Sequence, residues 1–155
     1  MKDAQKPDHT SLNNLVRWLK EGKYVIPDFQ RDFEWKPWDV RDLMRSIFLD
    51  YYIGSLLLWK GTNNNFESLA CEPIYGFEEE SNPEYIVLDG QQRLTALFQS
   101  LFYGKPVKTR DARKNAIERL YYLHIPTALD PNADQEDAIL SIPANKKILN
   151  FGWMN

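Results

Sequence analysis

Apolar residues recur at helical spacing in three stretches of the chain, residues 12–19, 40–51 and 94–102. In the middle stretch they fall at i, i+3, i+4, i+7, i+8 and i+11, the pattern of a helix with one buried face. Thr10 or Ser11 can cap the first helix, since hydroxyl oxygens accept hydrogen bonds from a helix N-terminus. The pattern therefore predicts three amphipathic helices.

Short continuous apolar runs predict four strands, at residues 24–26, 56–59, 85–88 and 120–125. The charged segment 111–119 is typical of a short helix, and the turn-rich segment 61–82 of a connector. The chain has 155 residues, 43% of them hydrophobic, which is enough for one good core. We expect one α/β domain over residues 1–155, a mixed sheet with packed helices.

The stretch "EYIVLDGQQRLTAL" joins a predicted strand to a predicted helix and places Arg93 in the first helical turn. A cation is mildly disfavoured there, because the helix dipole is positive at its N-terminus and several backbone N–H groups are unpaired. An external anion would remove the conflict. Alternatively, Asp89 caps the helix and Arg93 points into water. These residues alone leave both interpretations open.

The formal net charge of −3 excludes a basic field over the whole molecule, so any contact with nucleic acid must be local. A local basic patch lies between Lys105 and Arg119, although such runs are more often solvated. The single cysteine, Cys71, excludes an internal disulfide and a cysteine-rich zinc site. No apolar stretch is long enough for a membrane span, and we expect a cytoplasmic protein.

Several common catalytic sites lack the residues they need. The sequence contains neither a G-x-x-x-x-G-K-[ST] loop nor a G-x-G-x-x-G motif. His9 and His124 are the only histidines, which disfavours a Ser-His-Asp triad and a histidine-based metal nuclease. We interpret His124 as a structural residue inside a strand. The aromatic residues between Phe29 and Trp38 are spaced irregularly and favour packing over a base-stacking platform.

Polar residues cluster where predicted core elements end: Gln30 and Arg31, Gly54 and Ser55, and Asp89 to Arg93. Such residues either cap an element or converge on a ligand. A glycine turn before a helix leaves backbone N–H groups free for phosphate oxygens, and Arg93 and Arg31 supply charge-assisted donors. Asp89 could orient a water or hold Mg²⁺. The set is compatible with a phosphate site, but each residue alone is also compatible with a cap or with plain exposure, and for Asp89 alone an N-cap is slightly favoured.

Three stretches in order, "IPDFQRDFEW", "DLMRSIFLDYYIGSLLLW" and "YIVLDGQQRLTAL", resemble the N-terminal domain of GmrSD-type restriction enzymes, a branch of the ParB/sulfiredoxin-like superfamily. The resemblance is clear from Leu12 to Phe102 and weak over "LYYLHI". It implies a compact α/β fold that binds a nucleoside triphosphate and, in several members, hydrolyses it. Those proteins defend cells against phage or foreign DNA.

The main family motif falls on residues 89–95, and the upstream motif on residues 26–35, with Phe33 where a tyrosine is usual. The resemblance implies that Asp89 and Arg93 act in catalysis on ATP or GTP and that Asp89 holds Mg²⁺. It implies nucleotide contacts from a larger set of residues, namely Gln30, Arg31, Gly54, Ser55, Gly90, Gln91, Gln92, Arg93 and Thr95.

Many relatives carry a histidine-rich HNH-type nuclease domain, for which this chain has neither the length nor the histidines. We expect a longer natural protein, with DNA reached through a later nuclease domain, a partner or the Lys105–Arg119 patch. Two alternatives remain for the 155 residues: a DNA-binding module with little or no nucleotide turnover, and a ParB-like nuclease domain. The chain could also form a homo-oligomer.

Overall fold

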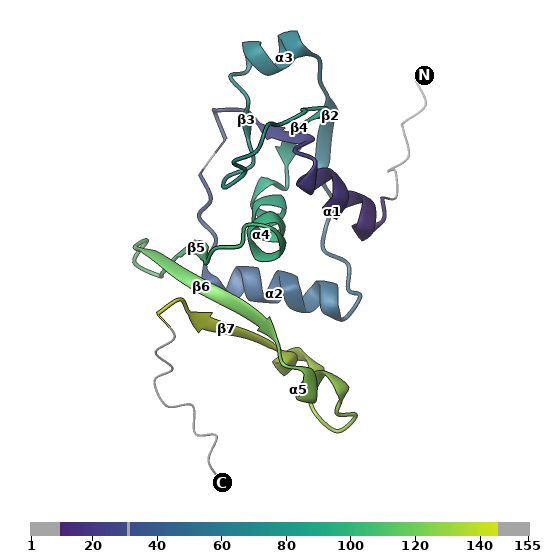
Figure 1. Cartoon of the computed structure of the whole chain (residues 1–155), viewed down its shortest axis with the longest axis vertical. Coiled ribbons are helices and arrows are strands. Elements are labelled where there is room, and N and C mark those ends of the chain that lie inside the picture. The colour runs from purple at the N-terminus through teal and green to yellow at the C-terminus, as the bar shows by residue number, and fades with distance from the viewer. Residues whose placement is uncertain (1–9, 31, 146–155) are drawn as a thin grey trace.

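The computed structural model describes residues 10–30 and 32–145, which form two sheets with helices packed around them (Figure 1). The helices are α1 (Leu12–Lys20), α2 (Pro37–Phe48), α3 (Asn63–Ser68), α4 (Gln91–Leu101), α5 (Ile125–Leu129) and the 3₁₀ helix η1 (Gln135–Ala138). The strands are β1 (Tyr24–Ile26), β2 (Leu57–Lys60), β3 (Glu72–Pro73), β4 (Tyr85–Asp89), β5 (Val107–Arg110), β6 (Ala116–Leu123) and β7 (Ile139–Pro143). The mixed α/β class predicted from the sequence is confirmed.

The first sheet is mixed and has the strand order β2-β4-β1-β3. β4 pairs in parallel with β1, where Tyr24 lies opposite Tyr85, and antiparallel with β2. β1 also pairs antiparallel with the short β3. Because β4 is an inner strand, its residues Ile86 and Val87 are fully buried, and its carboxyl end passes directly into α4.

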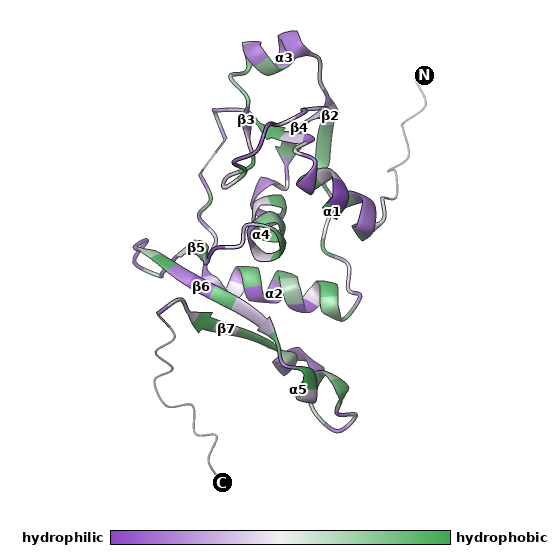
Figure 2. Cartoon of the chain, in the orientation of Figure 1, coloured by the Kyte–Doolittle hydropathy of each residue, from purple (hydrophilic) through white to green (hydrophobic). Residues whose placement is uncertain are grey.

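The core lies around α4, in which six consecutive residues are buried: Leu94, Thr95, Ala96, Leu97, Phe98 and Gln99. α1 and α2 both contact α4. Much of the α1 ribbon has hydrophilic colours in Figure 2, while its buried residues Leu15 and Leu19 belong to the core cluster. The amphipathic pattern of the sequence therefore places polar residues outward and apolar residues around one central helix.

The second sheet is antiparallel, with the order β5-β6-β7, and packs against α2. The Tyr121 hydroxyl of β6 donates a hydrogen bond of 3.1 Å to the carbonyl of Pro37, the first residue of α2. α4 holds β5, since the Gln99 side-chain oxygen accepts the Lys108 backbone N–H at 3.3 Å. The two sheets are thus connected through α2 and α4.

The strongly periodic elements are found close to their predicted positions. Ser11 caps α1 as predicted, because its hydroxyl accepts the Asn14 N–H at 3.3 Å. Segment 61–82, predicted as a connector, contains α3 and β3 as well. No helix in the described residues is both long and apolar enough to cross a membrane.

Two sequence-based predictions in the last third of the described chain are wrong. Segment 111–119 is a tight turn followed by the start of β6, because the Asp111 carboxylate accepts the backbone N–H groups of Arg113 and Asn115 and closes the turn. His124 is exposed and lies after the end of β6, at the N-cap of α5, where its Nδ1 is 2.8 Å from the Thr127 hydroxyl oxygen.

Candidate functional site

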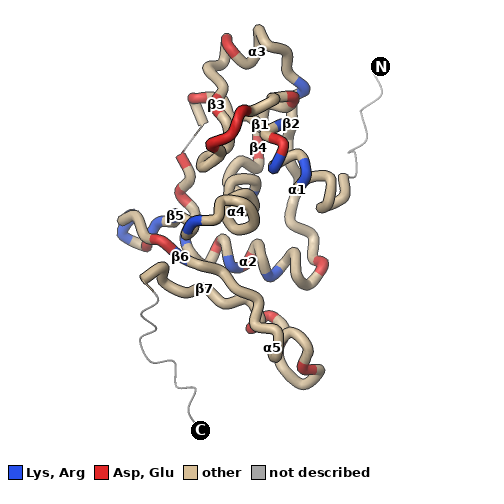
Figure 3. Tube along the Cα trace, in the orientation of Figure 1, with Lys and Arg blue, Asp and Glu red and all other residues tan. Residues whose placement is uncertain are grey.

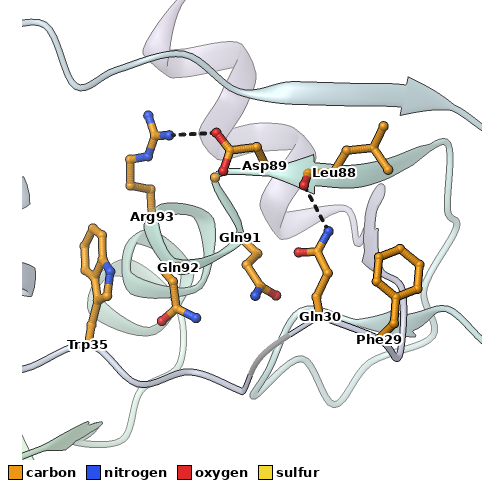
Figure 4. A pocket seen from close by; sticks show the side chains of 9 residues that line it. Phe29, Gln30, Trp35, Leu88, Asp89, Gln91, Gln92 and Arg93 are labelled. Atoms are coloured by element: carbon orange, nitrogen blue, oxygen red, sulfur yellow. Dashed lines mark hydrogen bonds and ion pairs between the residues drawn. The ribbon is translucent and has the colours of Figure 1, made fainter.

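A pocket of about 420 Å³ lies at the carboxyl end of β4, where the chain turns into α4 (Figure 4). Its lining combines the strand–turn–helix segment with the loop that follows β1. The lining residues are Phe29, Gln30, Trp35, Leu88, Asp89, Gly90, Gln91, Gln92 and Arg93. Two of the three polar clusters noted in the sequence therefore meet at one cavity.

The turn between β4 and α4 depends on Gly90, which has a φ of 94° and is the N-cap of α4. This left-handed conformation strongly favours glycine. A Cβ at this position would also lie 2.3 Å from Cδ2 of Leu56. Gly90 has no side chain with which to cap the helix, and Asp89, which belongs to β4, is not the N-cap that one interpretation of the sequence required. The first-turn residues Gln91, Gln92 and Arg93 line the pocket.

The Arg93 guanidinium is anchored by protein groups on one side. Its Nη1 donates to the Ile53 carbonyl at 2.9 Å, and its Nη2 is 3.7 Å from Oδ2 of Asp89. Gly54 permits this position, since a Cβ there would lie 2.2 Å from Nη1. The side chain is only 20% exposed, so Arg93 does not simply point into water. A guanidinium has five N–H donors, and these contacts leave several of them available.

Gln30 attaches the loop after β1 to the sheet. β1 ends at Ile26, and beyond it the Gln30 side-chain amide donates to the carbonyls of Val87 at 2.6 Å and Leu88 at 3.1 Å (Figure 4). The amide thus continues the pairing of β4 after the neighbouring strand has ended. Its donor nitrogen is occupied, and only the side-chain oxygen remains for a ligand.

Gln92 fixes the far wall of the pocket. Its side-chain oxygen accepts the Glu34 N–H at 3.0 Å, and its nitrogen donates to the Asp32 carbonyl at 2.8 Å. Both ends of the amide therefore bind the segment that leads to Trp35. The Trp35 carbonyl in turn accepts the Arg110 N–H of β5 at 3.0 Å. Gln92 positions this wall, and little of its side chain is left for a ligand.

The other predicted site residues occupy varied positions. Gln91 lines the pocket, whereas Thr95 is 2% exposed in the core and does not line it. The Ser55 hydroxyl pairs with the Tyr52 hydroxyl at 2.7 Å and is not part of the lining. Gly54 reaches the site only through its contact with Arg93. Arg31 lies outside the described residues.

Three lining residues were missed by the sequence interpretation: Phe29, Trp35 and Leu88. Phe29 is 68% exposed, which is unusual for a large aromatic side chain and contradicts its assignment to packing. Phe33 is buried in the core, as predicted. The signal that separates the two phenylalanines is position, since Phe29 follows Pro27 in a turn before the chain reaches the core again.

The carboxylate of Asp89 is 74% exposed at the pocket and meets the Arg93 guanidinium through only one of its oxygens. Within residues 10–30 and 32–145, no group of three or more His, Cys, Asp or Glu side chains is arranged to hold a metal ion. Mg²⁺, however, is usually bound by one or two carboxylates together with substrate phosphates. Asp89 therefore fits a metal only when a phosphate ligand completes the coordination.

The family model of the GmrSD restriction endonuclease N-terminal domain matches residues 12–150. The chain belongs to this family. The matched residues 12–150 include both sheets and the whole pocket. The chain is also 36% identical over 101 residues to an uncharacterised protein of Methanocaldococcus jannaschii, a match that covers 61% of this chain and 17% of that relative.

Proposed function

We propose that this GmrSD N-terminal domain binds and hydrolyses a nucleoside triphosphate and so regulates a DNA restriction or phage-defence protein. The observation that carries the proposal is the start of α4, where the helix begins after a left-handed glycine and its first turn lines a pocket. Backbone N–H groups and the helix dipole at such an end favour phosphate oxygens. Family membership supports the restriction context.

The pocket has the two chemical characters that a nucleotide requires. Arg93 lies at one end and the aromatic side chain of Phe29 at the other, with Asp89 and Leu88 between them (Figure 4). The first end suits a charged phosphate chain, and the second suits a flat base, because every base has an aromatic face that stacks on a phenyl ring. A volume of about 420 Å³ is within the range of small-molecule sites.

Hydrolysis is assigned to Asp89 and Arg93. Arg93 would donate its remaining N–H groups to phosphate oxygens and stabilise the charge that develops as the terminal phosphate is transferred. Asp89, with an exposed carboxylate, would orient the attacking water or hold Mg²⁺. When bound, Mg²⁺ would neutralise phosphate charge. The anchored Arg93 guanidinium loses little conformational freedom on binding, which favours a preorganised site.

The test is thermal unfolding of the full chain with ATP, GTP, CTP or UTP, each with and without Mg²⁺. Ligand at one hundred times its Kd stabilises by about 2.7 kcal/mol, which corresponds to a shift of roughly 5–11 °C for a domain of this size. We expect such a shift with at least one nucleotide. Asp89→Asn should abolish the part of the shift that depends on Mg²⁺ and should keep the fold, because the side chain is largely exposed.

Glu67→Gln is the matched control, since it removes one exposed carboxylate from α3, outside the pocket. This control should retain the whole nucleotide shift. The proposal is wrong if none of the four nucleotides shifts the transition. A shift that is equal in wild type and Asp89→Asn would leave nucleotide binding standing but would remove Asp89 from the site.

A further inference from the structure

Basic side chains without an acidic partner gather on the hairpin of β5 and β6. Elsewhere in the described chain, ion pairs engage Arg17, Lys23, Arg41, Arg45, Arg93 and Lys105. Lys20, Lys36 and Lys60 have no ion pair among the described residues, but each lies on a different element, on α1, at the N-cap of α2 and on β2. On the hairpin, Lys108, Arg110, Arg113 and Lys114 have none within the part of the chain that the structure describes. These four side chains, here called the hairpin cations, form a local excess of positive charge.

The acidic residues of the hairpin do not neutralise this charge. Oδ1 of Asp111 accepts the N–H groups of Arg113 and Asn115, each at 2.8 Å, and Oδ2 accepts the Asn115 side chain at 2.9 Å. The hydrogen bonds from the Asn115 side chain and backbone, followed by that from Arg113, lower the pKa of Asp111. Glu118 lies opposite Lys108 in the strand register. Five cations, the hairpin cations and Arg119 of β6, against two carboxylates leave a charge of +3 on this hairpin, in a chain of −3.

Near its turn the hairpin is a two-stranded antiparallel ribbon that extends from the body of the molecule (Figure 3), because β7 pairs with β6 only from Arg119 onward. Val107 and Thr109 alternate with Lys108 and Arg110 along β5, and the first pair is buried. Lys108 and Arg110 therefore lie on the outer face, and Arg113 and Lys114 lie in the turn. The major groove of B-form DNA is about 12 Å wide and admits such a ribbon, whereas the deep, narrow major groove of duplex RNA does not.

We propose that the β5–β6 hairpin binds double-stranded DNA, with the hairpin cations contacting backbone phosphates. Charges on an exposed edge strand can also serve only to prevent aggregation. β5 is such an edge strand. That explanation does not cover Arg113 and Lys114, which belong to the turn and not to the strand edge. The inference concerns a surface other than the pocket and holds whether or not a nucleotide binds there.

The test measures the affinity of the full chain for a short labelled DNA duplex by fluorescence anisotropy, at salt concentrations from about 50 to 200 mM. The variant combines Arg113→Gln with Lys114→Asn. Asparagine is chosen because Lys114 has a φ of 65°, a left-handed conformation that asparagine tolerates. The matched control combines Lys20→Gln with Lys60→Gln, on α1 and β2, and loses the same charge. Both lysines are exposed and have no ion pair among the described residues.

Each lost phosphate contact lowers the slope of log affinity against log salt by about 0.9, so the hairpin variant should lose about 1.8. If the plots of log affinity against log salt for wild type and variant meet at 1 M salt, this difference in slope corresponds to a roughly 60-fold loss of affinity at 0.1 M salt. The control should match wild type. Equal affinity of the two variants overturns the proposal, as does aggregation of the hairpin variant with unchanged DNA affinity. A hairpin-dependent affinity for duplex RNA alone overturns the assignment to DNA.

Discussion

Replacing Gly90 by alanine should destabilise the domain through two separable effects. The left-handed φ of 94° costs an alanine about 1–2 kcal/mol. The new Cβ would also lie 2.3 Å from Cδ2 of Leu56. Overpacking of this kind costs about 1–3 kcal/mol, and we expect about 1 because the Leu56 methyl is the end of a side chain that can rotate. The expected total is about 2–3 kcal/mol.

Gly104→Ala separates the two effects, since Gly104 also has a positive φ, of 65°, but no atom within 4 Å of its added Cβ. It should cost only about 1–2 kcal/mol. In a Leu56→Val background, which lacks the δ methyl groups, the free-energy cost of Gly90→Ala should fall to that of Gly104→Ala. Urea unfolding of the four proteins of this cycle gives the coupling free energy directly, expected at about 1 kcal/mol.

The reasoning is refuted if Gly90→Ala is no more destabilising than Gly104→Ala, or if Leu56→Val leaves the cost of Gly90→Ala unchanged. Either result would mean that Leu56 does not hold the turn between β4 and α4 in its observed position. The close contact at this turn would then not be the reason for a glycine.

Three further predictions concern single side chains. Gln92→Ala removes both hydrogen bonds that the amide makes, to the Asp32 carbonyl and the Glu34 N–H. Urea unfolding should show that the free energy of unfolding falls by about 1–3 kcal/mol. An unchanged free energy of unfolding would contradict the positioning role. Thr95→Val should leave nucleotide affinity unchanged in calorimetric titration, because Thr95 is buried outside the pocket; a large loss would place it in the site. Burial raises the pKa of Tyr121 to about 12 from about 10 in the unfolded chain, so its contribution to stability is complete below pH 10 and falls as the pH rises toward 12. Tyr121→Phe should reduce this alkaline loss in unfolding experiments, and an unchanged pH profile would contradict the assignment.

Local signals predicted the strand–turn–helix segment because each part of it is short-range. The apolar run of β4, the glycine turn and the helical spacing of α4 all lie within about twenty consecutive residues. The wall around it could not be predicted in the same way. The Gln92 and Gln30 amides bind backbone groups about sixty positions away in sequence, and no periodicity reports such contacts.

The hairpin was misread for a different reason. Its charged residues suggested a solvated helix, yet "DARKN" carries a turn signal, an Asp followed two and four residues later by backbone N–H groups that its carboxylate accepts. The alternation of buried and exposed residues in β5 is only four residues long, which is too short to predict a strand from the sequence. His124 was misplaced for another reason, because the apolar run "LYYLHI" continues to Ile125, whereas β6 ends at Leu123.

The central claim is that phosphates bind at the first turn of α4. Its most direct test is an NMR titration of the ¹⁵N-labelled full chain with Mg²⁺ and the nucleotide that stabilises it most. The account predicts that the largest shifts occur in the backbone N–H signals of Gln91, Gln92 and Arg93, with smaller shifts for the Phe29 and Leu88 amides. Shifts confined to the hairpin of β5 and β6, or the absence of any shift, would contradict it.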